Sequence, residues 1–142
     1  TCPPYADLEV YTDDPRDLSN MDYEDFKKAY FEIIDKACAK LKEDSFAAIV
    51  VGDVRDKKGV YRNFVSDTIE AFKEAGLLYY NEIVLLQPIG SASYRGNKTF
   101  GSKRKVVKIH QNVLVFVKGS IDKAVDKLTP YDDDVGFDED ES

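Results

Sequence analysis

A short apolar segment in the middle of the sequence limits the fold more than any other feature. It runs from Phe46 to Val51 as Phe-Ala-Ala-Ile-Val-Val, with no polar residue inside it. β-branched residues favour strands, and an uninterrupted apolar strand is typical of one that is buried on both faces of a parallel sheet. The segment therefore predicts a central strand that helices must cover.

Helical periodicity surrounds this strand. Apolar residues recur at helical spacing between Tyr23 and Leu41, which predicts an amphipathic helix over Met21 to Lys42 with Ser19 or Asn20 as its N-cap. The remaining predicted elements are a helix from Tyr61 to Gly76, strands at Leu77 to Gln87 and Gln111 to Lys118, and a short helix from Ser120 to Leu128. Alternating helices and strands predict an α/β chain with a mainly parallel sheet, whose last two strands can pair antiparallel.

The first residues form an unusual motif. Cys-Pro-Pro-Tyr occupies positions 2–5. Two prolines fix the backbone twice and remove two donors, and the first proline keeps Cys2 out of the helical region. The resulting stiff turn offers free carbonyls beside the Tyr5 ring, which suits a flat ring that carries an amino group. A plain Pro-Pro turn with an exposed tyrosine is the alternative.

The charge of the chain is unevenly distributed. The formal net charge is −7, but the segment from Tyr131 to Ser142 holds seven acids and no base. Without that segment, 20 acidic residues balance 20 basic ones. A block of like charges is usually a solvated tail, so residues 129–142 are expected to be an acidic disordered end. A mimic of nucleic acid is the alternative.

A basic stretch lies between Pro88 and His110. It contains three glycines, two aromatic residues and no acid. This composition predicts a flexible loop that contacts nucleic acid, and the alternative is a solvated loop. The candidate binding residues are Tyr94, Arg95, Lys98, Lys103, Arg104 and Lys105.

Other chemistry is restricted by composition. Cys2 and Cys38 lack metal-ligand spacing, and Cys38 lies on the apolar side of a predicted helix, so we expect a buried free thiol in a reducing cytosol. His110 is the single histidine, which excludes a site with several histidine ligands. No apolar run reaches the length of about 20 residues that a membrane span needs.

Two features together carry a family resemblance. Cys2 to Tyr5 resembles the Asp/Asn/Ser-Pro-Pro-Tyr/Phe motif of S-adenosylmethionine-dependent DNA amino-methyltransferases, which make N6-methyladenine or N4-methylcytosine. Thr1 to Gly119, roughly five-sixths of the chain, resembles phage and bacterial DNA-modification methylases. Phrases that carry the likeness are Val-Val-Gly-Asp-Val-Arg-Asp-Lys-Lys-Gly and His-Gln-Asn-Val-Leu-Val-Phe-Val-Lys-Gly.

The resemblance implies a fold. Residues 1–128 would form the C-terminal half of a Rossmann-like class I methyltransferase domain, with the Pro-Pro-Tyr motif just after the fourth strand. Phe46 to Val51 would be the fifth strand. Leu77 to Gln87 with Gln111 to Lys118 would be the terminal antiparallel pair, and helices would flank the sheet.

The resemblance also implies site residues. Cys2, Pro3, Pro4 and Tyr5 would be catalytic, with the Pro3 carbonyl accepting from the target amino group and Tyr5 stacking on the flipped base. The family usually has Asp, Asn or Ser where this chain has Cys2, which is a weaker acceptor. Neither a metal nor a covalent enzyme intermediate is implied. The expected partner is DNA, in the cytoplasm of a bacterial or phage-infected cell with a restriction-modification system.

One family feature is missing from the sequence. The family binds S-adenosylmethionine on a glycine-rich turn after its first strand, and no such turn follows an early strand here, since Gly52-Asp53 follows one but holds a single glycine. We therefore expect another half of the domain to hold most of the cofactor, and a second chain or second copy to cover the open sheet edge. The chain alone is expected to be inactive. The alternatives are a non-catalytic nucleic-acid or protein binding module, and an RNA amino-methyltransferase.

Overall fold

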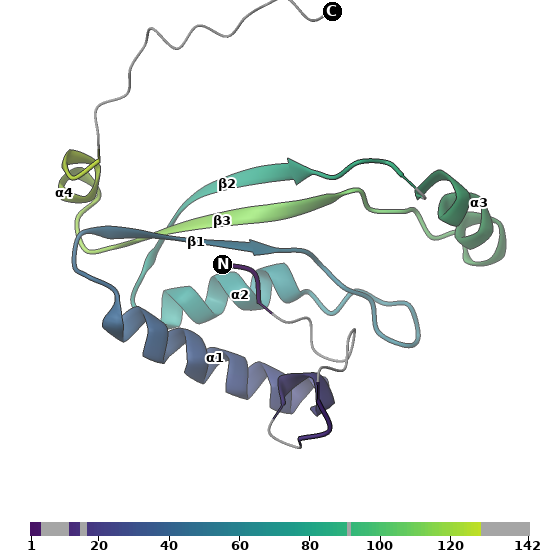
Figure 1. Cartoon of the computed structure of the whole chain (residues 1–142), viewed down its shortest axis with the longest axis horizontal. Helices are drawn as coiled ribbons and strands as arrows, with labels where there is room; N and C mark the ends of the chain where they lie inside the picture. Colours follow the sequence, from purple (N-terminus) through teal and green to yellow (C-terminus); the bar gives the residue numbers. More distant parts are fainter. Residues whose placement is uncertain (4–11, 15–16, 91, 129–142) are drawn as a thin grey trace, which may run out of the picture.

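The protein folds as a three-stranded sheet with two helices packed on one face (Figure 1). The computed structural model describes residues 1–3, 12–14, 17–90 and 92–128. The strands are β1 (Ser45–Val51), β2 (Leu78–Leu86) and β3 (His110–Lys118), in the order β1-β3-β2. The helices are η2 (Leu18–Asn20), α1 (Tyr23–Lys40), α2 (Phe64–Glu74), α3 (Ala92–Lys103) and α4 (Ile121–Asp126).

The strand pairing confirms the expected antiparallel pair. β2 pairs antiparallel with β3 from Leu78 opposite Val117 to Leu86 opposite His110. β1 also pairs antiparallel with β3 on its other side. The expectation of a mainly parallel sheet was wrong for these strands: β1 and β2 point the same way, but β3 lies between them, so each neighbouring pair is antiparallel.

The core lies between the sheet and the two long helices. Phe26 and Tyr30 of α1 contact Phe64 of α2, and Phe72 stacks on Phe116 of β3 with ring centroids 4.2 Å apart. All five rings are buried. Truncating a buried phenylalanine to alanine typically costs about 3–5 kcal/mol, so this aromatic cluster is a major part of what holds α1 and α2 against the sheet.

Helix α1 begins later than the sequence pattern predicted. Its N-cap is Asp22, whose carboxylate accepts a hydrogen bond from the Asp25 N–H at 3.0 Å. The expected caps were therefore wrong: Ser19 and Asn20 belong to η2, and the Asn20 side chain donates to the Thr12 and Asp14 carbonyls. At the other end, the Lys118 ammonium donates to two terminal carbonyls of α1 at 2.9 Å, which ties the helix to β3.

The buried thiol is confirmed. Cys38 is buried on α1 and forms no disulfide, and burial raises the pKa of its thiol. A thiol that is buried and protonated is a poor nucleophile. Cys38 is therefore part of the packing.

The basic stretch was expected to be a loop, and this was wrong for most of its length. Residues Ala92–Lys103 form α3, which extends beyond the ends of β2 and β3 (Figure 1). Gly96 and Gly101 disfavour a helix by roughly 1 kcal/mol each, which is why the sequence pattern indicated a loop. The hydroxyls of Thr99 and Ser102 donate to carbonyls one turn back, at 2.8 and 2.9 Å.

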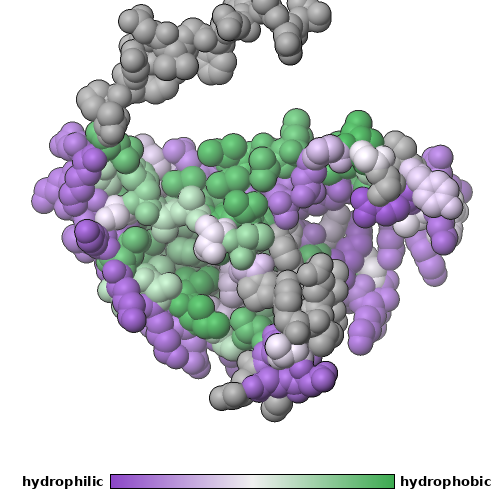
Figure 2. Space-filling view, in the orientation of Figure 1, coloured by the Kyte–Doolittle hydropathy of each residue, from purple (hydrophilic) through white to green (hydrophobic). Residues whose placement is uncertain are grey.

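The sheet face away from α1 and α2 is apolar and partly open. Strand alternation places Phe46 and Val50 of β1, Val113 and Val115 of β3 and Ile83 of β2 on this face. Ile83 is 57% exposed. Figure 2 shows apolar residues along β2, where each of the nine strand residues is exposed. Among the described residues, no helix has the length and apolar character that crossing a membrane requires.

Candidate functional site

Thr1 lies along the free edge of β1. Its ammonium group donates to the Ala48 carbonyl at 3.0 Å, and the Val50 N–H donates to the Thr1 carbonyl at 2.8 Å. These two bonds on either side of Ile49 are the pattern of parallel strand pairing. The chain therefore leaves Thr1 toward the carboxyl end of β1, the direction in which Cys2 and Pro3 follow. Figure 1 shows the N-terminus beside β1.

The structure describes only part of that motif. Cys2 is exposed and Pro3 is partly buried. The remaining predicted catalytic residues, Pro4 and Tyr5, lie outside the described residues. Their placement stays a prediction, as do the catalytic roles of all four residues.

The turn after β1 ties the sheet to α2. Gly52 is buried, and the Asp53 carboxylate accepts from the Val65 N–H at 3.1 Å. Asn63 is the N-cap residue by position, but its left-handed backbone, with φ of 64°, gives no side-chain cap bond. Asp53 thus satisfies one of the free N–H groups in the first turn of α2.

A buried polar cluster lies behind this turn. The Asp67 carboxylate accepts from the Tyr23 hydroxyl and from the Lys27 ammonium, each at 2.8 Å. Burial, with the hydrogen bond to Asp67, raises the pKa of Tyr23, and the same carboxylate raises the pKa of Lys27. Because this carboxylate is buried and held by two donors, we assign the cluster to holding α1 on α2 rather than to chemistry.

Two loops meet at the same end of the sheet. Arg55 packs over the Tyr61 ring, 3.8 Å from the centroid, and donates to the Gly59 carbonyl at 2.8 Å. The Lys105 side chain lies so close to Gly59 that a Cβ at position 59 would collide with its ammonium group. Gly59 also has φ of 91°, a left-handed conformation that favours glycine, while the flexible Lys105 side chain could move aside. The loop after β1 therefore packs on the loop before β3.

The predicted nucleic-acid residues lie on or next to α3. Tyr94 is 78% exposed, and Arg95, Lys98 and Lys103 are exposed on the helix. Arg104 lies over the Phe100 ring at 5.4 Å. Lys105 differs from the others because its ammonium group packs on Gly59. The structure thus brings these six residues to one end of the molecule, but not into one cluster.

A hollow of about 390 Å³ lies between α3 and the strand ends. Its lining comes from the turn after β1, the end of β2, α3 and the start of β3. The lining residues are Gly52, Asp53, Val54, Gln87, Arg95, Lys108, His110 and Gln111. Of these, only Arg95 was a predicted site residue.

Sequence reasoning missed Lys108 and His110 because it treated the stretch from Pro88 to His110 as one loop. The Gln87 N–H donates to the Ile109 carbonyl at 2.9 Å, so the β2–β3 pairing continues past Leu86. Lys108 and His110 therefore lie on either side of Ile109, whose backbone this hydrogen bond holds in place. The signal that could have found them is the alternation of polar and apolar residues just before the last strand.

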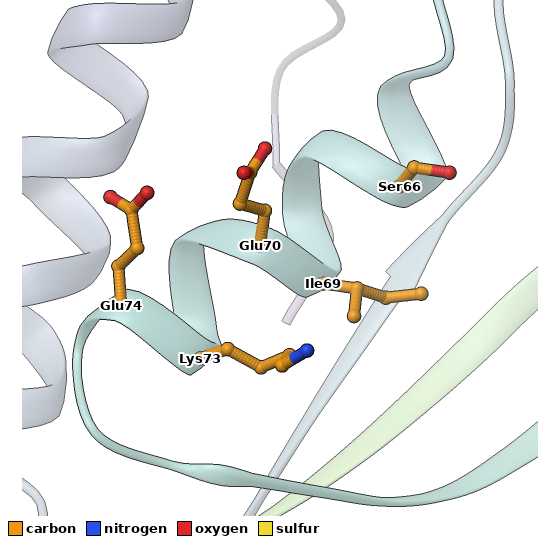
Figure 3. Close-up of a pocket in the computed structure, with 5 residues that line it drawn as sticks. All are labelled: Ser66, Ile69, Glu70, Lys73 and Glu74. Carbon is orange, nitrogen blue, oxygen red and sulfur yellow. The ribbon is translucent and has the colours of Figure 1, made fainter.

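A larger hollow of about 570 Å³ lies elsewhere, on α2 (Figure 3). Its lining is Ser66, Ile69, Glu70, Lys73 and Glu74, all from that one helix. Figure 3 shows Glu70 and Glu74 pointing to one side of α2 while Lys73 points away from them. Because its polar groups do not converge, we do not assign a site to it.

The described residues do not fit S-adenosylmethionine. The one strand in the described part that leads into a Gly-Asp turn is β1, and Asp53 of that turn bonds to α2. A glycine-rich turn and a free acid for the cofactor are both missing there. Within the same residues, no group of three potential metal ligands is present.

Neither a protein-family model nor a curated protein matches this sequence. Solved structures do match its fold. One is TTHA0409 of Thermus thermophilus, a proposed DNA modification methylase, complexed with S-adenosyl-L-methionine. It has a TM-score of 0.58 and 16% identity, over 84% of this chain and 44% of that chain. Another structure of that protein gives a TM-score of 0.53 and 18% identity, over 83% and 43%. The chain thus spans less than half the length of these structures, and it has the α/β fold of part of a methyltransferase domain.

Proposed function

We propose that this chain is the target-base half of an S-adenosylmethionine-dependent DNA amino-methyltransferase. The observation that carries the proposal is the pairing of Thr1 with β1, which directs Cys2 and Pro3 toward the carboxyl end of that strand. The likeness of the fold to a DNA modification methylase supports it. In open α/β sheets, ligands bind outside the carboxyl ends of the strands, where this motif begins.

The proposed roles follow the resemblance of the motif. The Pro3 carbonyl accepts a hydrogen bond from the exocyclic amino group of adenine or cytosine, and Tyr5 stacks on the flipped base. Together they hold the amino nitrogen in line for methyl transfer, so the contribution of the chain is positioning and charge stabilisation. S-adenosylmethionine would supply the methyl group.

The cofactor is assigned to another part of the enzyme. The matched structure is more than twice as long as the region that it shares with this chain, and the acid of the Gly-Asp turn after β1 is used to cap α2. We propose that a second polypeptide, or a second copy, supplies that part and covers the free edge of β1. A bare apolar strand edge is an aggregation liability, so the partner would also stabilise the sheet.

The second candidate is a non-catalytic binding module that keeps the half-fold. The use of Asp53 in capping α2 favours it, because this acid then serves structure rather than a ligand. In that reading, the basic end of the molecule binds nucleic acid without modifying it.

Mass-resolved light scattering separates the two candidates. The chain is measured as purified, with and without any co-purifying polypeptide, and binding of labelled S-adenosylmethionine is measured on each species. The proposal expects a stable complex that binds the cofactor while the lone chain does not. A folded homomer that binds no cofactor would support the binding module instead.

A further inference from the structure

The hollow at the strand ends gathers positive side chains from separate parts of the chain. Arg95 comes from α3 and Lys108 from the segment just before β3, while His110, the first residue of β3, lines the hollow beside them. We propose that this hollow binds a phosphodiester group of a nucleic-acid strand. The proposal rests on the proposed function and adds a specific contact site to it.

Both cations in the hollow are available to a ligand. Among the described residues, Arg95 and Lys108 form no ion pair, in contrast to Lys27 and Lys28. Arg95 is exposed and Lys108 is half-buried. A guanidinium group matches two phosphate oxygens at once, and an ammonium group adds a point charge.

The one acid in the hollow is already engaged. Asp53 accepts from the Val65 N–H in the first turn of α2, at 3.1 Å. The positive end of the helix dipole lies there and offsets part of the carboxylate charge. Arg95 and Lys108 therefore keep a net positive hollow even with Asp53 present, and Figure 2 shows hydrophilic residues gathered at this end.

The backbone around the hollow is held in place. The bond from the Gln87 N–H to the Ile109 carbonyl fixes the segment that carries Lys108 and His110. The Ala92 N–H donates to the Ile89 carbonyl at 2.7 Å, which holds the start of α3 one turn before Arg95. Preformed geometry lowers the entropy cost of binding a small group.

The size of the hollow suits a nucleotide unit. Its volume of about 390 Å³ falls within the usual range for small-molecule sites. A neighbouring hollow of about 380 Å³ shares Asp53, Lys108 and His110 and adds apolar walls from Val106, Val107 and Ile109. A strand whose phosphate contacts Arg95 and Lys108 would thus find an apolar surface for its sugar beside it.

The test is oligonucleotide binding by the full chain, with no cofactor added. Fluorescence anisotropy of a labelled single-stranded oligonucleotide is measured over a salt series for the natural chain and for the Arg95→Gln/Lys108→Gln variant. Each lost phosphate contact lowers the slope of log affinity against log salt by about 0.7, so the double variant should lose about 1.4. The matched control is Lys28→Gln/Lys36→Gln on α1, whose side chains are 74% and 73% exposed, and it should keep the slope.

A second readout uses the single histidine. In the natural chain, the imidazole NMR resonances of His110 should move when the oligonucleotide is added, and they should stay in place in the double variant. Arg95→Gln alone changes an exposed side chain, so it tests the site without a risk to folding. This single variant should lower the salt slope by about 0.7, half of the decrease expected for the double variant.

Three results would overturn the inference. They are an unchanged slope in the double variant, an equal loss of slope in the control on α1, and no oligonucleotide binding by the natural chain. None of them involves methyl transfer. Failure of the methylation assay would therefore contradict the proposed function while leaving this binding site intact.

Discussion

At the scale of single residues, the described site is built from polar groups that serve structure. Asp53 caps α2 and Asp67 joins Tyr23 to Lys27, so neither acid is free for catalysis. Cys2 and Pro3 stay predicted site residues, and the sequence marks them out because two prolines restrict the backbone strongly. The Asp67 cluster was not, because Asp67 lies 44 and 40 positions from its two partners and periodicity shows only that each lies on a helix.

Tyr23→Phe should destabilise the fold in a way that depends on pH. A hydrogen bond to a charged group contributes about 1.5–3 kcal/mol, and the variant loses the one to Asp67. The folded state raises the pKa of Tyr23, so the stabilisation is complete below the ordinary pKa of 10.0 and falls as the pH rises above it.

Urea unfolding at neutral pH and above pH 10 measures this effect. The advantage of the natural chain over Tyr23→Phe should shrink at the higher pH. Tyr80→Phe is the control, since the described residues give its hydroxyl no hydrogen bond. An advantage that stays constant with pH would contradict the assignment.

Tyr5→Ala should abolish methyl transfer by the assembled enzyme with little loss of fold. Tyr5→Phe keeps the ring and should keep most of the rate, because stacking requires only an aromatic face. The measurement is incorporation of labelled methyl groups, with circular dichroism to confirm folding. Methyl transfer by the Tyr5→Ala variant would contradict the proposed stacking role of Tyr5.

At the scale of elements, sequence patterns predicted strands and long helices well and the basic stretch poorly. Phe46 to Val51 and Leu77 to Gln87 agree with β1 and β2 to within a residue. α3 was missed because Gly96 and Gly101 have low helix propensity. The hydroxyl hydrogen bonds that stabilise this helix leave no periodic apolar pattern in the sequence. The hollow beside Arg95 was missed with it, since a loop gives no fixed side-chain positions.

Gly101→Ala tests whether α3 is a helix. Position 101 has open space around it and ordinary helical backbone, so alanine should stabilise the protein by about 0.5–1 kcal/mol. Gly59→Ala is the opposing control and should destabilise it, because φ at position 59 is 91° and alanine is strained there. Thermal unfolding measures both. No gain from Gly101→Ala would argue for a loop in solution.

At the scale of the whole molecule, the chain is a sheet with one covered face and one open apolar face. α1 and α2 cover one side, while Val50, Val113 and Ile83 face the other. Thr1 occupies only one position on the free edge of β1. The acidic segment 129–142 lies outside the described residues. Its prediction as a disordered tail therefore stays a prediction. The sequence predicted an incomplete sheet because the glycine-rich half that the family resemblance implies is not found in it, and a partner on the free edge of β1 stays a prediction.

The measurement that tests the central claim most directly is methyl transfer to DNA. The chain, alone and together with any polypeptide that co-purifies with it, is incubated with DNA and labelled S-adenosylmethionine, and the hydrolysed bases are identified by mass spectrometry. We predict label on the exocyclic amino group of adenine or cytosine with the complex, and none with this chain alone. Label at a ring carbon, or no label from a complex that binds both DNA and cofactor, would contradict the account.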